Sequence, residues 1–103
     1  MTAPGENVTT MAGYQAEARR TINRALTDDQ RLLDASAGLA EEAGEVLAHV
    51  RKHVLQGRPL DRDAVTLELG DALWCLAIAA DTLGVTLAEV AQRNVEKLRS
   101  RFP

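Results

Sequence analysis

The sequence predicts an all-α domain of four helices in a bundle-like arrangement. Apolar residues make up 46% of the 103 residues but aromatic residues only 3%, so alanine, leucine and valine have to build the core. Such a composition favours packed helices over a β-sandwich. Helix start and stop signals also divide the chain into four segments with short connections. A chain of this length forms one domain, or part of an oligomer that shares a core.

The first helix is predicted over residues 12–26, where apolar residues recur at helical spacing. The preceding residues 1–11 are small, polar and unpatterned, and we expect a flexible N-terminal tail there. The domain then covers residues 12–103. A break at residues 27–30 provides a new N-cap, and the second helix is predicted to run from there to about residue 54.

Glycine and proline in Gln56–Leu60 end the second helix. Either Asp61 or Asp63 can cap the third helix, whose end is predicted at Gly84, a residue that suits the left-handed position after a helix. The second and third helices are both long, so we expect them to pair in antiparallel fashion.

The start of the fourth helix is the clearest local signal in the chain. Thr86 and Glu89 form a predicted capping box, and Val85 and Val90 a hydrophobic staple around it. This helix is predicted to run to about Arg101.

Composition excludes several classes of function. The net charge of −3 gives no basic footprint for a nucleic acid. Cys75 is the single cysteine, which excludes an intramolecular disulfide and fits a reducing compartment. No apolar stretch reaches the length of a membrane span, and the chain does not begin with a signal peptide. We therefore expect a cytoplasmic protein without nucleic-acid or membrane partners.

Two acidic clusters are the most informative feature. Glu42 and Glu45 lie one turn apart in the second helix, and Glu68 and Asp71 lie one turn apart in the third. Antiparallel packing can bring all four carboxylates to one level. The second pair sits in the run 64–80, which is apolar on nearly every side and therefore predicted to be buried. Two buried acids need a strong positive partner, and because the run contains no lysine or arginine, a divalent cation is the simplest one.

Carboxylate oxygens select hard cations, so we expect Mg²⁺, with Mn²⁺ as a substitute. Gly44 and Gly70 stand beside the acids, and since glycine within a helix costs about 0.5–1 kcal/mol relative to alanine, we expect close backbone approach or room for a ligand there. A solvated helix face is the alternative for the first cluster alone, and a pair of structural acids for the second. The two clusters together favour metal-assisted phosphoryl or nucleotidyl transfer to water.

The pattern Glu41-Glu42-x-x-Glu45 followed by Glu68-x-x-Asp71 resembles the signature of the MazG-like nucleoside triphosphate pyrophosphohydrolases, in the all-α NTP pyrophosphatase superfamily. The resemblance covers about residues 12–103. Further matching segments are Tyr14-Gln15, Gly44-Glu45-Val46, Glu68-Leu69-Gly70-Asp71-Ala72-Leu73-Trp74 and Asn94–Pro103.

The resemblance implies Mg²⁺-dependent hydrolysis of nucleoside triphosphates at the α–β phosphoanhydride, giving a monophosphate and pyrophosphate, as house-cleaning of the nucleotide pool. It also implies homodimers or homotetramers in which helices of two chains complete each site. A phosphoribosyl-ATP pyrophosphohydrolase-like enzyme is the alternative within the superfamily. From another class, the alternative is a non-catalytic metal-binding helical interaction module.

The resemblance also implies residue roles. The implied metal ligands are Glu42, Glu45, Glu68 and Asp71. The implied catalytic residues are Glu41 and Glu45, with Glu41 either supporting the metal ligands without contacting the metal or orienting the attacking water. The implied substrate-binding residues are Lys52, Trp74, Asn94, Lys97 and Arg101. The alternatives are an exposed lysine for Lys52, a core residue for Trp74 and a solvated basic helix end for the last three.

Overall fold

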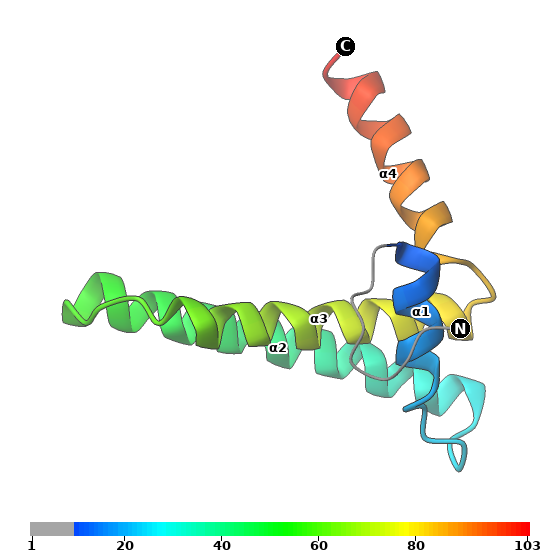
Figure 1. Ribbon diagram of the computed structural model, residues 1–103, viewed down its shortest axis with the longest axis horizontal. Helices are drawn as coiled ribbons and strands as arrows, with labels where there is room; N and C mark the ends of the chain where they lie inside the picture. Colours follow the sequence, from blue (N-terminus) through cyan, green and yellow to red (C-terminus); the bar gives the residue numbers. More distant parts are fainter. Residues whose placement is uncertain (1–9) are drawn as a thin grey trace.

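The computed structural model describes residues 10–103, which form four α-helices and no strand. The helices are α1 (Met11–Arg19), α2 (Asp28–Gln56), α3 (Arg62–Thr82) and α4 (Leu87–Arg101). Figure 1 shows α2 and α3 as a long antiparallel hairpin, with α1 packed across the end where α2 begins, while α4 leads away from the hairpin. The all-α prediction with four helices is confirmed. Residues 1–9 of the expected tail lie outside the described residues.

Local signals begin α2 and α3, and end α2, close to where the sequence predicts. The Thr27 hydroxyl accepts the backbone N–H of Gln30, and the Gln30 side chain accepts the N–H of Thr27, so a capping box starts α2. Gly57 ends that helix with a φ of 65°, in the left-handed region. Asp61, rather than Asp63, caps α3 through its carboxylate.

α4 begins after Thr86, whose hydroxyl accepts the N–H of Glu89 at 3.0 Å. Only this half of the predicted capping box is formed among residues 10–103. The Glu89 carboxylate instead lies 3.8 Å from the guanidinium of Arg93, one turn further along the helix. The helix still starts as predicted, because the Thr86 hydroxyl alone satisfies one of the unpaired N–H groups of the first turn.

A buried glutamine of α1 fixes the start of α4. The Gln15 side chain is 3% exposed, accepts the N–H of Leu87 at 2.9 Å and donates to the carbonyl of Val85 at 3.2 Å. Beside it, Arg19 pairs with Asp81 near the end of α3 at 2.7 Å. α1 is therefore joined to both ends of the connection at which the chain turns by 101° from α3 into α4.

The first helix is shorter than the predicted span of residues 12–26, since it ends at Arg19. Polar side chains form hydrogen bonds with backbone N–H and C=O groups that would pair with each other in a longer helix. The Thr21 hydroxyl donates to the Ala18 carbonyl at 2.8 Å, and the Asn23 side chain accepts the N–H of Ala25 at 3.0 Å. These local bonds compete with helix formation and replace it by turns.

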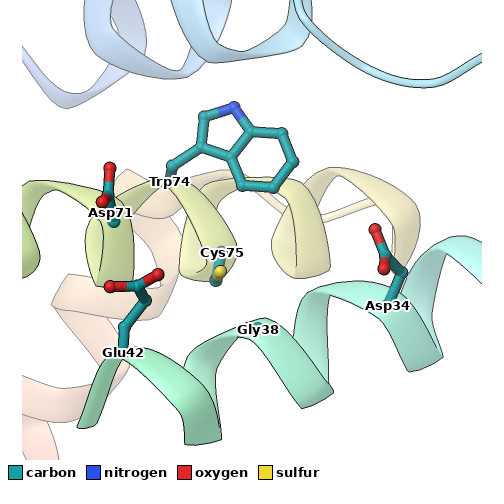
Figure 2. Close-up of a pocket in the computed structure, with 6 residues that line it drawn as sticks. All are labelled: Asp34, Gly38, Glu42, Asp71, Trp74 and Cys75. Carbon is teal, nitrogen blue, oxygen red and sulfur yellow. The ribbon is translucent and has the colours of Figure 1, made fainter. Parts of the chain in front are cut away.

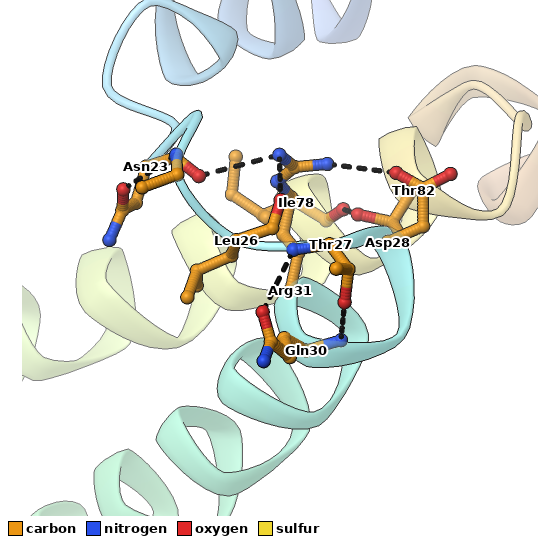
Figure 3. A network of polar contacts seen from close by, with 9 residues as sticks. Asn23, Leu26, Thr27, Asp28, Gln30, Arg31, Ile78 and Thr82 are labelled. Atoms are coloured by element: carbon orange, nitrogen blue, oxygen red, sulfur yellow. Dashed lines mark hydrogen bonds and ion pairs between the residues drawn. The ribbon is translucent and has the colours of Figure 1, made fainter.

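Arg31 holds the connection between α1 and α2. Its guanidinium donates to the carbonyls of Asn23 and Leu26 at 3.3 and 3.1 Å, and it lies 3.1 Å from the Asp28 carboxylate (Figure 3). The Arg31 side chain is only 16% exposed. A mostly buried cation thus fixes a segment that helical periodicity alone would extend as a helix.

The core is small and lies where α1, α3 and α4 meet the first turns of α2. Its buried members are Ala18, Ala35, Ala77, Ile78, Ala80 and Leu87. The prediction that the run 64–80 is buried is wrong for its first half, because Leu67 and Leu69 are 71% and 55% exposed. α1 covers only one end of the hairpin, so much of the apolar surface of α3 remains exposed within one chain.

Within residues 10–103, no single helix is long and apolar enough to cross a membrane, whereas α3 and α4 together meet that test on length and composition as a bent pair.

Candidate metal centre

Three carboxylates of the α2–α3 hairpin converge on one point. Glu42 comes from α2, whereas Glu68 and Asp71 come from α3, where a spacing of one turn puts them on one face. One oxygen of each lies within 4.8 Å of the others. Figure 2 shows the Glu42 side chain reaching from α2 toward α3, beside Asp71. Antiparallel pairing therefore brings members of the two acidic clusters together.

The crowding of negative charge acts most strongly on Glu42. A hydrogen bond with Glu68, burial, and the charges of Glu68, Asp71 and Glu45 raise the pKa of Glu42 to about 7. The residue is only half-buried, yet its Oε2 atom is shielded from solvent and has no hydrogen-bond partner within residues 10–103. A shielded carboxylate oxygen without a donor is unfavourable unless a proton or a cation meets it.

These three carboxylates are ligands that suit a hard divalent cation. Carboxylate oxygens are the ligands that Mg²⁺ and Mn²⁺ prefer, and Mg²⁺ usually takes only a few of them and keeps water or phosphate oxygens in its other positions. A cation between Glu42, Glu68 and Asp71 would offset their repulsion and give the shielded Oε2 atom a partner. These three residues are therefore the ones that would hold it.

The other predicted acids lie at the edge of this group. Glu45, a predicted ligand, is exposed and is not among the three converging carboxylates, although its charge contributes to the raised pKa of Glu42. Glu41 is exposed as well, on the neighbouring face of α2. The structure thus brings together three of the four predicted ligands.

The predicted basic residues do not gather around the carboxylates within one chain. Lys97 and Arg101 are exposed on α4, which packs against α1 and α3 but not against α2. The end of α4 that carries them points away from the hairpin in Figure 1. Lys52 is exposed further along α2, about two turns beyond Glu45.

A cavity of about 230 Å³ opens beside the carboxylates (Figure 2). Its lining residues are Asp34, Gly38, Glu42, Asp71, Trp74 and Cys75. Trp74 is half-buried against the core, and its indole N–H donates to the Thr21 hydroxyl at 2.7 Å. Burial, followed by the charges of Glu42 and Asp34, raises the pKa of the Cys75 thiol, which keeps it protonated.

A larger, mostly apolar cavity of about 520 Å³ lies on the other side of α3, between α1 and α4. Tyr14 and Asn94 are among its lining residues, so the structure places Asn94 in this cavity and not beside the converging carboxylates. Burial, with the charge of Asp71 as the next cause, raises the pKa of the Tyr14 hydroxyl.

The close approach of the helices lies at a glycine that sequence reasoning did not single out. A Cβ atom at Gly44 or Gly70 would meet nothing within 4 Å, so of the two expectations the structure shows open space there within one chain and not close approach. At Gly38 a Cβ would lie 2.9 Å from the Sγ of Cys75. Asp34 was not singled out from the sequence either. Asp34, Gly38 and Glu42 are spaced four residues apart, which places all three on one side of α2.

Comparison with known proteins agrees with the resemblance read from the acidic motifs. Residues 30–103 match the MazG nucleotide pyrophosphohydrolase domain family. The chain is similar to the Gene 37 protein of Mycobacterium phage L5, with 42% identity over 62% of this chain and 60% of that protein. It is also similar to the uncharacterized protein YvdC of Bacillus subtilis (strain 168), with 36% identity over 62% of this chain and 69% of that protein.

The chain thus spans 60% of the length of the phage relative. No solved structure gives a significant match. The all-α fold, the converging carboxylates and the family match over most of the chain lead to one conclusion: this chain belongs to the MazG nucleotide pyrophosphohydrolase domain family.

Proposed function

We propose that this protein is a divalent-cation-dependent pyrophosphohydrolase that cleaves nucleoside triphosphates between the α and β phosphates. The observation that carries the proposal is the convergence of Glu42, Glu68 and Asp71 within 4.8 Å, with a shielded and unpartnered Glu42 oxygen, in a chain of the MazG family. Mg²⁺ is the working cation that this oxygen-only donor set favours, and Mn²⁺ is its substitute.

A bound Mg²⁺ would hold the phosphate oxygens and offset their charge. Water attacks the α-phosphorus, the bond from that phosphorus to the bridging oxygen breaks, and the bridging oxygen leaves with pyrophosphate. We assign Glu41 and Glu45 to orienting the water and accepting its proton, because they lie next to the ligands without belonging to the converging group.

We also propose that a second copy of the chain completes each site, in a homodimer or homotetramer. α4 does not contact α2 in its own chain, and its end points away from the hairpin in Figure 1, so we place Lys97 and Arg101 at the phosphates of a partner's site. The positively charged side chains of Lys97 and Arg101, one turn apart, would neutralise part of the triphosphate charge. Exposed leucines on α3 supply apolar surface for such an assembly. Lys52, Trp74 and Asn94 remain further proposed substrate contacts.

Product analysis tests the proposal. With Mg²⁺ and a nucleoside triphosphate in oxygen-18-labelled water, we expect the monophosphate to carry the label and pyrophosphate to be unlabelled. Asp71→Asn should abolish turnover with unchanged helical circular dichroism, whereas Asp63→Asn, an exposed acid on the same helix, should retain it. Diphosphate and orthophosphate as the main products, or full activity of Asp71→Asn, would refute the assignment.

A further inference from the structure

The 230 Å³ cavity is continuous with the carboxylate group, because Glu42 and Asp71 belong to both. Pockets that enclose a whole drug-sized ligand measure roughly 300–1,000 Å³, so this cavity suits one part of a nucleotide. Asp34 stands at its far end, about two turns or roughly 12 Å before Glu42 along α2. That separation corresponds to the reach from the phosphates across the sugar to the outer edge of the base in an extended nucleotide.

Asp34 is an exposed residue of α2. Its carboxylate makes no ion pair or hydrogen bond within the part of the chain that the structure describes, whereas Asp28 and Asp81 each pair with an arginine and Asp61 caps α3. Figure 2 shows the Asp34 carboxylate on the cavity side of α2. A negative charge there disfavours phosphate and favours a group that donates hydrogen bonds.

The wall beside Asp34 suits an aromatic ring. The indole N–H of Trp74 is already bonded to Thr21, and Figure 2 shows the indole nitrogen turned away from Gly38 and Asp34. Ring carbons are therefore what Trp74 presents to the cavity, and such a surface stacks with flat rings. Gly38 has no side chain, which leaves the space between Asp34 and Glu42 open.

From these observations we infer that the cavity receives the nucleobase and that Asp34 selects guanine nucleotides. The inference rests on the proposed function, since it needs the phosphates at the carboxylate group. A carboxylate accepts two parallel hydrogen bonds from adjacent donors. Guanine offers such a pair, N1–H and the 2-amino group. Adenine and cytosine place an acceptor nitrogen beside their amino group, and uracil and thymine place carbonyl oxygens on both sides of a single N–H.

The test compares guanine with hypoxanthine, which differs only in lacking the 2-amino group. The kcat/KM for GTP should exceed that for ITP about tenfold or more, as expected for one charge-assisted hydrogen bond, and dGTP should exceed dITP likewise. Asp34→Asn should reduce this ratio to near one. Asp29→Asn makes the same charge change on α2 away from the cavity, and should keep the ratio of the parent protein.

Equal kcat/KM values for GTP and ITP in the parent protein, or an unchanged ratio in Asp34→Asn, would overturn the inference and leave the proposed function standing. Absence of turnover with every nucleotide would instead count against the proposed function. The cavity can then be tested by binding alone: with Mg²⁺, GMP should raise the melting temperature more than IMP, and Asp34→Asn should remove the difference. Equal melting shifts in the parent protein would overturn the inference.

Discussion

Glu42 occupies a position where its own ionisation is unfavourable. Its carboxyl lies close to those of Glu68 and Asp71, and it has one oxygen that solvent does not reach. The resulting pKa of about 7 means that the group changes charge near neutral pH while the cation is absent. A cation and a proton therefore compete for the same oxygens.

Without metal, we expect stability to fall as the pH rises toward and past 7. The folded pKa of Glu42, about 7, lies above the unfolded value of 4.5, so the folded state binds more protons between these values. The stabilisation is therefore complete below about pH 4.5 and lost as the pH rises through about 7. Melting temperatures measured in EDTA between pH 5 and 8 should decline, and Glu42→Gln should flatten the decline.

Added Mg²⁺ should act in the opposite direction, because it binds the ionised carboxylates. The rise in melting temperature on adding Mg²⁺ should therefore grow with pH. A rise of the same size at every pH would show that Glu42 does not titrate together with binding.

Gly38 lies where α2 and α3, the two helices that carry the acids, come close together. Gly38→Ala should lower the free energy of unfolding by about 1–3 kcal/mol, because the added Cβ overlaps the Sγ of Cys75. Gly44→Ala is the matched control: its Cβ meets nothing, so better helix propensity should stabilise the chain by about 0.5–1 kcal/mol. Urea unfolding gives both values.

The double variant Gly38→Ala with Cys75→Ala removes the clashing sulfur and should recover most of the loss. If the two substitutions change the free energy of unfolding additively, the overlap of the added Cβ at position 38 with the Cys75 Sγ does not cause the loss of stability.

Among single residues, the sequence predicted positions within one helix more fully than contacts between two helices. The spacing of Glu68 and Asp71 fixes a shared face, and three of the four predicted ligands do converge. Gly38 of α2 lies against Cys75 of α3, a contact between two helices that no local pattern contains. The role of Glu45 as a ligand stays a prediction, and the close approach at Gly38 needed the structure.

At the scale of helices, the capping residues were predictable because each cap is a contact between residues three apart. Thr27, Asp61 and Thr86 all begin helices as their sequences indicate. The early end of α1 was not predictable from periodicity, since it depends on turn contacts and on the buried guanidinium of Arg31. The role of Gln15 was equally hidden, because its partners lie far along the chain.

Gln15→Leu should destabilise the fold by about 1–3 kcal/mol. It keeps a side chain of similar size but leaves the N–H of Leu87 and the carbonyl of Val85 without partners in a buried place. Chemical denaturation measures the loss. Gln92→Leu on exposed α4 is the control and should change stability little, since its one bond, to Glu96, is at the surface. Equal losses in the two variants would exclude a special role for the buried amide.

At the scale of the whole molecule, one chain is an open arrangement. The hairpin carries its acids at a distance from the core, and α4 carries its basic residues away from the hairpin. Exposed apolar residues lie along both α3 and α4, with Leu67 at 71% and Leu98 at 46%. The length of the chain indicated that its core could be shared in an oligomer, but the direction of α4 needed the structure.

Mixing two defective chains tests whether sites are shared. One chain carries Glu42→Gln with Asp71→Asn, and the other Lys97→Ala with Arg101→Ala. If each site takes acids from one chain and α4 from the other, a mixed dimer has one intact site. Co-expression should then restore about a quarter of the wild-type rate when chains pair at random. Activity no higher than that of either defective protein alone would show that acids and basic residues do not act across chains.

The chain contains one tryptophan, and Trp74 stands in the wall of the cavity beside the carboxylates. The protein therefore carries its own optical probe, and no dye has to be attached to follow what enters the site. We expect GMP with Mg²⁺ to quench the indole emission by stacking, whereas tripolyphosphate, which has no ring, should leave its intensity nearly unchanged. Thr21→Val, which removes the hydroxyl partner of the indole N–H, should shift the emission maximum before any ligand is added. A fluorescence titration can thus distinguish binding of the base in the cavity from binding of the phosphates alone.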